Sequence, residues 1–386
     1  MKEDINNRDS LRILVLGNAA PYRIGGAEVQ TRRLADAFCR SGHRVAIAGY
    51  AMPNQSDEVV PWSSLNVRVR GETRSLRALS FTLALSRLLL RHRKSFDLIY
   101  SRVIGESILV AAVLKFIGII RQPMIVSSAC AGESGDAAAL THLPGKPFIV
   151  HLINRTCSAI NILSPQIAKE LADLGLRRDR FTYIPNGVPA STFTLHRQCD
   201  YEKQRSFLYV GRLSRQKRVD LLLLALSRLT DSGHPTRLHI VGDGPDKQEL
   251  ICLAGRLGIA DRVFFHGNID PEEVPYHYSR HAVFVLSSRD EGQPNALLEA
   301  MASGMPVIVT ASGGAEYLAD ETVGLTCPPD DPDAIYLAMS RMLEMPAGQL
   351  VRMGERARCK VQSKFDLQHV ARQYLDLFAK LVGTAG

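Results

Sequence analysis

The sequence lacks any run of apolar residues long enough to cross a membrane. A membrane-spanning helix needs roughly 18–20 such residues, whereas the most apolar stretches are interrupted, as Lys115 interrupts residues 107–120. The first ten residues have no apolar centre, so we expect no signal peptide. These absences favour a cytoplasmic protein that is either soluble or peripheral on the inner face of the cytoplasmic membrane.

Cysteine motifs and metal-ligand spacings are also missing. The seven cysteines are scattered, odd in number and never arranged as Cys-x-x-Cys, which argues against a disulfide framework and against a zinc site. We find no convincing Asp-x-Asp pair near the end of a predicted strand. We therefore expect that the protein requires no metal ion and no other cofactor.

Positive charge is concentrated in the first half of the chain. Residues 1–187 hold 25 Lys and Arg against 15 Asp and Glu, a balance of +10, and the remainder holds 22 against 24, a balance of −2. An anionic partner is therefore expected only at the first half. Nucleic acid is disfavoured, because the basic residues are not interleaved with aromatic residues that could stack on bases. The pattern favours contact with an anionic membrane.

One segment could form the contact with a membrane. Residues 74–94 have the spacing of a helix that is apolar on one side and basic on the other. Such a helix could lie on an anionic membrane. The same pattern describes a helix that covers a sheet and exposes a basic face to water, so both interpretations stay open.

Length and hydrophobic periodicity predict an α/β protein with two domains. At 386 residues the chain exceeds what one hydrophobic core usually covers. Residues 1–187 alternate short apolar runs with helical patterns, which is typical of a parallel sheet covered on both faces. The predicted strands are 12–17, 44–48, 67–69, 97–100, 124–127, 159–163 and 181–184, and the predicted helices are 26–41, 75–93, 105–118, 146–157 and 164–174.

A second alternating series follows a polar, irregular segment. We interpret residues 188–205 as a linker, residues 206–365 as the second domain and residues 366–386 as a final helix that packs back on the first domain. Two doubly wound, Rossmann-like domains would face a central cleft at the carboxyl ends of their strands, where ligands bind. The second domain's predicted strands are 207–210, 237–241, 263–266, 282–286, 307–310 and 323–326, and its predicted helices are 218–230, 246–257, 271–280, 294–302, 313–319, 332–344 and 347–361.

Two carboxylates flank the start of one predicted helix. Pro294 suits the first turn of that helix, Glu291 lies in the loop before it, and Glu299 projects one turn in. The unpaired N–H groups of a helix N-terminus favour phosphate. Carboxylates beside a phosphate site suggest recognition of hydroxyl groups, one set from a ribose and one from a sugar. The alternative is a solvated loop Glu beside a Glu on a helix face.

The first turn of the second domain carries two cations. Arg212 leaves the end of a strand directly after the small Gly211, and Lys217 follows at a helix start. Arg through its planar fork and Lys as a point charge can together hold a diphosphate. Charges exposed on a surface loop are the alternative explanation.

Glycine-rich turns follow several other predicted strands. Gly25 and Gly26 open a helix and would let the backbone approach an anion, although the spacing is not Gly-x-Gly-x-x-Gly and a plain turn would look the same. Gly242 lies in a tight turn, Gly267 lies where a flat base could rest against the backbone, and Gly313 begins another turn. Each turn alone is a weak signal. The coincidence of the last three turns at successive strand ends of the second domain is a strong signal.

In their order along the chain, these segments resemble the retaining, nucleotide-sugar-dependent glycosyltransferases of the GT-B architecture, specifically glycosyltransferase family 4. The resemblance covers nearly the whole chain and is densest between Tyr183 and Pro329. Six segments carry it, which are Ile24-Gly-Gly-Ala27, Pro185-Asn-Gly-Val188, Val210-Gly-Arg-Leu-Ser-Arg-Gln-Lys217, Val241-Gly-Asp-Gly-Pro245, Phe265-His-Gly267 and Glu291-Gly-Gln-Pro-Asn-Ala-Leu-Leu-Glu299.

The resemblance implies roles for individual residues. Arg212 and Lys217 would hold the donor diphosphate and stabilise the departing charge, and Glu291 would contact the transferred sugar, so these three are the catalytic candidates. Glu299 would accept hydrogen bonds from the ribose hydroxyls. The other donor-binding residues that the family implies are Gly25, Gly26, Gly211, Gly242, Gly267, Ile269, Gly292, Pro294, Asn295 and Ala296.

One loop departs from the family pattern. Many relatives carry a His on the first-domain loop that faces the donor sugar, and residues 126–136 contain none. A subset of the family is similar in having Gly-Glu-x-Gly-Asp at that place. Glu133 and Asp136 are therefore the acceptor-positioning candidates, and acceptor selection is expected in loops 50–64 and 128–145.

The leading hypothesis is a retaining glycosyltransferase that moves a sugar from a UDP- or GDP-sugar to a saccharide or lipid-linked acceptor, as in envelope, exopolysaccharide or lipopolysaccharide biosynthesis. A nucleotide-sugar epimerase of the same architecture is one alternative, disfavoured because Glu291, Gly292 and Glu299 match the transferase pattern. A non-catalytic sugar-binding scaffold is the other, and the missing His keeps it open.

Overall fold

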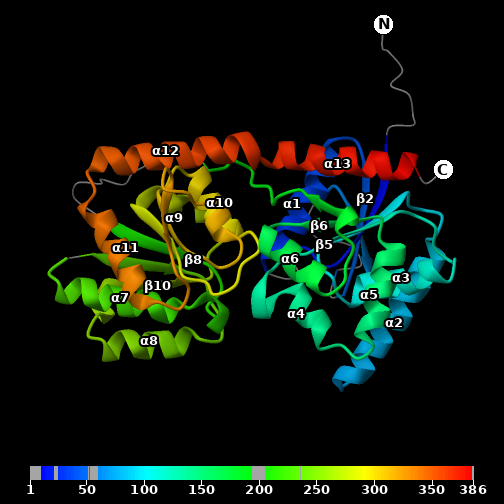
Figure 1. The fold of residues 1–386 in the computed structure, drawn as a ribbon, viewed down its shortest axis with the longest axis horizontal. Helices are drawn as coiled ribbons and strands as arrows, with labels where there is room; N and C mark the ends of the chain where they lie inside the picture. Colours follow the sequence, from blue (N-terminus) through cyan, green and yellow to red (C-terminus); the bar gives the residue numbers. More distant parts are fainter. Residues whose placement is uncertain are drawn as a thin grey trace, which may run out of the picture. The chain divides into compact units, whose positions relative to one another are not determined.

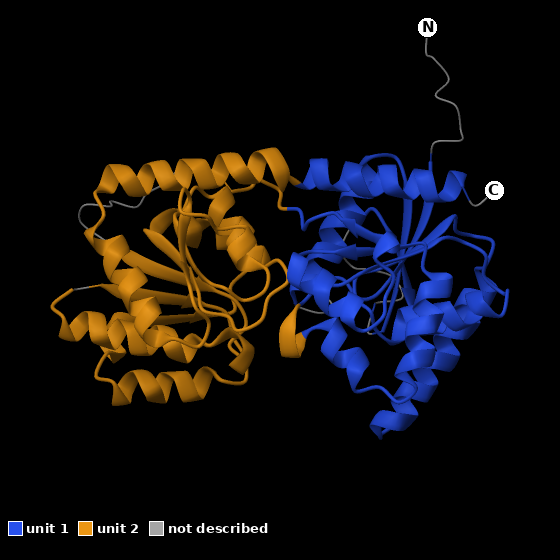
Figure 2. Ribbon diagram, viewed as in Figure 1, with its two compact units in different colours: residues 1–130, 135–187, 367–386 blue, residues 131–134, 188–366 orange. Residues whose placement is uncertain are grey.

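The computed structural model describes residues 10–20, 25–50, 52, 60–193, 205–234 and 236–384. The chain forms two compact units (Figure 2). Unit 1 comprises residues 1–130, 135–187 and 367–386, and unit 2 comprises residues 131–134 and 188–366. The chain therefore enters unit 2 briefly at residues 131–134 and again after Gly187, and it returns to unit 1 at Leu367.

Unit 1 is built on a parallel sheet with the strand order β3-β2-β1-β4-β5-β6-β7 (Figure 1). All neighbouring strands run parallel, and Ile13 of β1 lies between Val45 and Leu98 of its two neighbours. The strands are β1 (Arg12–Leu16), β2 (Arg44–Gly49), β3 (Ser63–Asn66), β4 (Leu98–Ser101), β5 (Met124–Ser127), β6 (Ala159–Ile162) and β7 (Phe181–Tyr183).

Helices cover both faces of this sheet because successive side chains of a strand point to opposite faces. Val15 packs in one buried cluster with Phe38 of α1 and Phe378 of α13, whereas the adjacent Leu14 lies near Leu89 of α2. The helices of unit 1 are α1 (Gly26–Arg40), α2 (Arg74–Arg91), α3 (Glu106–Phe116), α4 (Asp136–Thr141), α5 (Lys146–Thr156), α6 (Pro165–Asp173) and α13 (Leu367–Gly383).

A buried polar network joins helix α13 to the strand ends of unit 1. Tyr374 is fully buried, and its hydroxyl accepts a hydrogen bond from Asn161 Nδ2 at 2.9 Å and lies 3.4 Å from Ser127 Oγ. Arg102, also buried, donates from Nη2 to Asn186 Oδ1 at 2.7 Å. Because buried polar groups are costly when left unpaired, these contacts define one position for α13 in unit 1.

Unit 2 is built on a second parallel sheet, in the order β10-β9-β8-β11-β12-β13. Helix α7 packs against α8 and α11, and α10 packs against α12 (Figure 1). The strands are β8 (Ser206–Val210), β9 (Arg237–Val241), β10 (Val263–Gly267), β11 (Val283–Leu286), β12 (Val307–Thr310) and β13 (Gly324–Cys327). The helices are α7 (Val219–Asp231), α8 (Lys247–Arg256), α9 (Val274–Arg280), α10 (Asn295–Ala302), α11 (Pro332–Glu344) and α12 (Ala347–Lys364).

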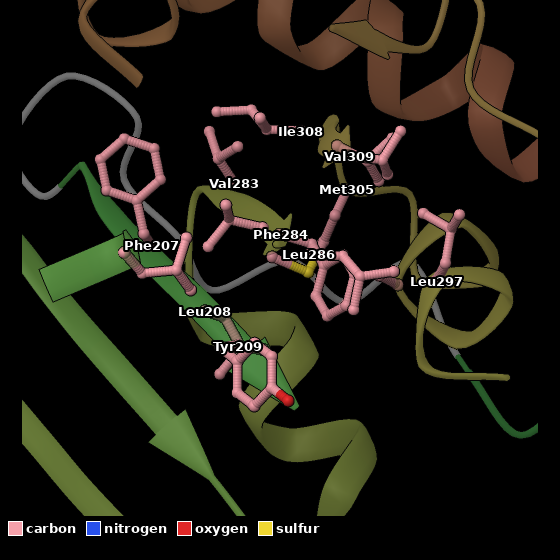
Figure 3. Packing of buried hydrophobic residues seen from close by; sticks show 14 of the residues in the cluster. Phe207, Leu208, Tyr209, Val283, Phe284, Leu286, Leu297, Met305, Ile308 and Val309 are labelled. Carbon is pink, nitrogen blue, oxygen red and sulfur yellow. The ribbon is translucent and has the colours of Figure 1, made fainter. Parts of the chain in front are cut away.

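The core of unit 2 is apolar and lies at the centre of its sheet. Figure 3 shows side chains of β8, β11, β12 and α10 gathered in one cluster, and Phe207, Phe284, Leu297 and Met305 are fully buried within it. Fully burying an apolar side chain contributes roughly 1.5–3 kcal/mol. The strands that carry the candidate site therefore belong to the most strongly packed part of this unit.

The predicted fold class, two doubly wound α/β domains with parallel sheets, is confirmed. Several individual elements differ from prediction. The third strand is Ser63–Asn66 rather than 67–69, and residues 313–319 form only a short 3-10 turn at Ala315–Tyr317. Helix α4 was not predicted, because six residues are too few to show a helical period.

The residues between the predicted domains divide between unit 2 and the undescribed part of the chain. Val188, Ala190 and Phe193 belong to the buried core of unit 2. Residues 194–204 lie outside the described residues, as do most residues of the predicted acceptor loop 50–64. In the described part of the chain, no helix combines the length and the apolar character that crossing a bilayer requires.

Four histidines cluster on β9, β10 and α9 of unit 2. His239 Nδ1 lies 3.0 Å from His266 Nε2. The ring of His239 lies 4.1 Å from that of His281, and the ring of His266 lies 4.7 Å from that of His277. Burial, with the neighbouring imidazoles second, lowers the pKa of His239 to about 4 and that of His281 to about 3. The cluster is therefore neutral near pH 7.

Stability of unit 2 should fall as the pH is lowered from about 7 toward 4. In the unfolded chain these histidines titrate near about 6.5, so below that pH the unfolded state binds protons that the folded state does not, and unfolding becomes easier. In His239→Phe the difference in Tm between pH 7.5 and pH 5.0, measured by thermal denaturation, should shrink by about 2–4 °C. Exposed His142→Gln is the control, and an unchanged pH dependence in His239→Phe would contradict this explanation.

Candidate functional site

The candidate residues of unit 2 follow the carboxyl ends of adjacent parallel strands. Gly211 and Arg212 follow β8, Gly242 follows β9, and Gly267 ends β10. Glu291 lies in the loop that connects β11 to α10. Since the strands are parallel, all these positions lie at one edge of the sheet, which is where ligands bind in doubly wound folds.

Two glycines allow the loops at this edge to touch through their backbones. A Cβ atom on Gly242, whose φ is +132°, would overlap the carbonyl oxygen of Gly211. A Cβ atom on Gly314 would overlap the carbonyl oxygen of Gly292. The loops after β8 and β9, and those after β11 and β12, therefore approach more closely than any other residue would permit.

Lys217 and Glu291 meet at the centre of this edge. The Lys217 ammonium lies 2.5 Å from Glu291 Oε1, and both side chains are largely buried. Ser288 Oγ also donates to Glu291 Oε1, at 2.7 Å. Strand β8 borders both β9 and β11, so the sheet order reverses direction between the strands that carry these residues. The ion pair thus occupies the topological switch point of unit 2.

Hydrogen bonds to backbone carbonyl oxygens hold the two loops together around the ion pair. Arg289 N donates to Gln216 O at 2.8 Å, and Gln216 Nε2 donates to Asp290 O at 2.8 Å. Ser287 Oγ donates to Lys217 O at 2.8 Å. The protein itself therefore fixes the position of the Lys217 ammonium before any ligand binds. A cation that is already in position favours binding of an anion, because it need not reorganise.

Tyr209 lies beneath these loops at the end of β8. Its ring is fully buried, and its hydroxyl donates to Arg212 O at 3.1 Å. Burial raises the pKa of Tyr209 well above its ordinary value, and the Glu291 carboxylate raises it further. Tyr209 therefore stays a neutral hydrogen-bond donor that supports the backbone of Arg212.

The Arg212 guanidinium is exposed and has no side-chain hydrogen bond or ion pair among the described residues. Lys217, five residues later, is held by Glu291. Arg212 thus offers an unpaired planar guanidinium, and Lys217 offers an ammonium whose position is fixed. This combination suits a diphosphate that approaches the strand edge.

The N-terminus of α10 lies directly after Glu291. Pro294 is the N-cap residue with an extended backbone, and Asn295 and Ala296 form the first turn. Glu299 is buried, and Tyr278 donates from its hydroxyl to Glu299 Oε2 at 3.1 Å. Because Tyr278 fixes this carboxylate near the first turn, Glu299 is placed to accept hydrogen bonds close to a helix end that favours phosphate.

The predicted base-binding positions lie at the end of edge strand β10. Gly242 N donates to Gly267 O at 2.7 Å, and Gly267 has a φ of +72°, a conformation that favours glycine. Ile269 is half-buried against the core of unit 2. Backbone groups and one aliphatic side chain thus line the edge where a flat base was predicted to lie.

The remaining donor-binding candidates lie in unit 1. Gly25 is the N-cap of α1 and Gly26 is its first residue. They follow the carboxyl end of β1, as predicted. Ile24, which belongs to the same sequence segment, lies outside the described residues.

The two acceptor candidates have different surroundings. Glu133 has an 85% exposed side chain and lies 3.8 Å from the Arg289 guanidinium. Asp136 is half-buried and accepts a hydrogen bond from Ala129 N at 2.9 Å. Burial raises the pKa of Asp136 to about 6, although hydrogen bonds from Ser128 and Ala129 oppose the shift. Asp136 therefore organises its own loop, whereas Glu133 is open to solvent.

Two residues that position the carboxylates were not predicted from the sequence. Ser288 is three positions before Glu291, and a hydroxyl at that spacing in a short loop could have been noticed. Tyr278 is 21 positions before Glu299 and lies on another helix, so no local pattern connects them. Among the described residues, no three His, Cys, Asp or Glu side chains are grouped as metal ligands.

Two family models match the chain. Residues 195–360 match the family described as glycosyl transferases group 1, and residues 25–187 match the glycosyl transferase 4-like domain. Mannosylfructose-phosphate synthase of Agrobacterium fabrum is 32% identical over 246 residues, which are 58% of this chain and 54% of that protein. The chain thus spans about half the length of this curated relative.

Two solved structures share the fold over nearly the whole chain. Sucrose-phosphate synthase of Thermosynechococcus elongatus has a TM-score of 0.82 at 21% identity and covers 97% of this chain and 100% of its own. The Anabaena protein HepE, solved in complex with UDP, has a TM-score of 0.76 at 20% identity and covers 96% and 100%. These similarities confirm the predicted GT-B architecture.

Replacing Gly314 by Ala should destabilise the protein, because the new methyl group overlaps the Gly292 carbonyl and must displace a loop. We expect the free energy of unfolding in urea to fall by about 1–3 kcal/mol. Gly255→Ala is the matched control. Gly255 lies in helix α8, and a Cβ atom added there would have no neighbouring atom within 4 Å. It should be neutral or stabilising by up to about 1 kcal/mol. Equal effects of the two substitutions would contradict the proposed loop contact.

Proposed function

Since the chain belongs to the group 1 glycosyl transferases, with a glycosyl transferase 4-like domain before them, we propose that it transfers a sugar from a nucleotide-diphospho-sugar to a hydroxyl group of an acceptor. The observation that carries this proposal is the Lys217–Glu291 ion pair at the switch point of unit 2. It combines a fixed cation for a diphosphate with a carboxylate for sugar hydroxyls.

In the proposed reaction the acceptor oxygen forms a bond to the anomeric carbon as the bond from that carbon to the diphosphate breaks. Positive charge develops on the sugar and negative charge on the departing diphosphate. Arg212 and Lys217 offset the negative charge, and Glu291 holds the sugar through its hydroxyls. In this proposal an oxygen of the departing diphosphate accepts the proton of the acceptor hydroxyl, so the step balances. Two cations of the chain supply the charge stabilisation, so we expect no metal requirement.

The donor is proposed to be a UDP- or GDP-sugar. Anabaena HepE was solved in complex with UDP, and the edge at Gly267 and Ile269 offers a backbone surface for a base. Glu299, held by Tyr278, is the proposed partner of the ribose hydroxyls. Gly25 and Gly26 at the start of α1 are also proposed to bind phosphate.

The acceptor is proposed to be a saccharide or a lipid-linked saccharide of envelope, exopolysaccharide or lipopolysaccharide assembly. The excess of positive charge in residues 1–187 supports this proposal, because it suits a peripheral contact with an anionic membrane. Exposed Glu133 beside the loop of Glu291 is the candidate contact for the acceptor. We expect the protein to act in the cytoplasm, on the inner face of the membrane.

Incubating the protein with a panel of UDP- and GDP-sugars should show slow hydrolysis of one donor, because water can replace an absent acceptor. Proton NMR should show that the sugar released first keeps the anomeric configuration of the donor, and that hydrolysis continues in EDTA. Tight nucleotide binding without hydrolysis would favour a sugar-binding scaffold instead. An epimerised nucleotide-sugar among the products would favour the epimerase alternative.

Lys217→Ala should lower kcat/KM for the donor by about 10²–10³-fold, because it removes the fixed charge opposite the leaving group. Glu133→Ala should change it by less than about 3-fold. The double variant Lys217→Ala, Glu291→Gln removes the unpaired buried charge, so it should recover stability without recovering turnover. Equal kinetic losses in Lys217→Ala and Glu133→Ala would contradict the assigned roles.

A further inference from the structure

Helix α2 has an exposed leucine stripe opposite its buried face. Phe81, Leu85 and Leu89 face the interior of unit 1. Four other leucines are 37–57% exposed, and their spacing of three, four and seven residues aligns them along one side of the helix. The leucine stripe consists of Leu76, Leu79, Leu83 and Leu90. The helix is thus apolar on two faces, which corrects the expectation of one apolar and one basic side.

The described residues leave the leucine stripe exposed, so packing among them does not explain it. Scattered exposed leucines are ordinary on protein surfaces, but an aligned row that extends about 21 Å along a helix indicates an interaction site. Exposed Arg87 and Arg91 flank the row in the last turns of α2. The neighbouring helix α3 ends in exposed Phe116 and Ile117, and α2, α3 and α5 pack in succession (Figure 1).

An open pocket of about 910 Å³ lies at the end of the leucine stripe. It is formed where α2 and α3 end and where β1 begins, so it lies at the edge of the unit 1 sheet opposite Gly25 and Gly26. Among the described residues, four cations and three apolar side chains line it, and none of the lining residues is acidic. The lining residues on which the proposal rests are Arg12, Leu90, Arg93, Lys94, Phe96 and Arg121.

Three of the four cations are available to a ligand. Arg12 pairs with Asp97 at 2.7 Å. Arg93 donates one hydrogen bond, from Nη1 to Leu90 O at 3.0 Å, which leaves its other donors free. The side chains of Lys94 and Arg121 have no hydrogen bond or ion pair among the described residues. The pocket therefore carries a local excess of about three positive charges.

Stabilisation of the helix ends is the competing explanation for these cations. Basic residues near a helix C-terminus interact favourably with its dipole, and the Arg93 contact with Leu90 O is of this kind. Lys94 and Arg121 make no such contact. A ligand is the better explanation for them, and the apolar Leu90, which belongs to both the pocket and the leucine stripe, indicates that the ligand is amphiphilic.

We propose that this pocket binds the phosphate headgroup of an anionic phospholipid while the leucine stripe of α2 enters the same leaflet. Burying leucine side chains among acyl chains removes apolar area from water, and each basic residue near an anionic surface adds to the attraction. The proposal deepens, and rests on, the membrane contact proposed above. It involves no residue of the donor site.

Sedimentation with phosphatidylglycerol vesicles tests the proposal. The parent protein should bind them, should bind phosphatidylcholine vesicles far less, and should be released as salt is raised. The triple variant Arg93→Gln, Lys94→Gln, Arg121→Gln should bind about 100-fold more weakly. The control Arg68→Gln, Arg70→Gln, Arg178→Gln removes three exposed charges elsewhere in unit 1 and should weaken binding by less than about 5-fold.

A second pair of variants tests the leucine stripe. Leu79→Gln with Leu83→Gln should reduce vesicle binding by at least about 10-fold. The control Ile251→Gln with Leu337→Gln alters two exposed apolar residues of unit 2 and should leave binding unchanged.

Several outcomes would overturn the proposal. Equal losses in the basic triple variant and its charge-matched control would show attraction by net charge alone. A lower Tm with unchanged binding in the basic variant would support the helix-end explanation. Binding of free glycerol 3-phosphate without binding to vesicles would indicate a soluble phosphate ligand. Donor hydrolysis measured without vesicles should be normal in all these variants, so a failed membrane site and a failed transferase are distinguishable.

Discussion

The candidate site depends on backbone contacts that no residue with a Cβ atom would allow. Gly242 lies against Gly211, and Gly314 lies against Gly292. These contacts bring together the loops that follow four strands of one sheet. Lys217, which follows β8, reaches Glu291, which follows β11, because these two strands are adjacent in the sheet and hydrogen bonds join their loops. The geometry of the site thus depends on close backbone packing at a few glycines and on the order of the strands.

The two units use charge in different ways. In unit 2 the Lys217 ammonium is largely buried and paired, so its position is fixed and its field is little screened. In unit 1 the cations near the ends of α2 and α3 are exposed, so their attraction to an anion is strongly screened by salt. A buried, oriented cation suits catalysis at a defined atom. A group of exposed cations beside apolar side chains suits adhesion to an extended surface.

Most helices and strands were predictable from the sequence. Where a prediction was wrong, the cause is local. The 18-residue helix α2 and the buried strand β12 were placed within one or two residues, because the first has a clear helical period and the second is a run of apolar residues. Helix α4 and strand β3 are short and half-polar, so they carry too few residues to show a period. The exposed leucine stripe of α2 was misjudged, because a helix that is apolar on two faces still shows one average hydrophobic direction.

The sequence by itself determined the fold class, the family resemblance and the residue types of the candidate site, since these follow from periodicity and from ordered glycine, Lys, Arg and Glu segments. Only the tertiary structure decided which of them meet. It pairs Lys217 with Glu291 across 74 positions and gives Glu299 the partner Tyr278. It also distinguishes half-buried Asp136 from exposed Glu133. The physical reason is that side-chain partners and burial depend on how strands are ordered in a sheet, which no local pattern of residues records.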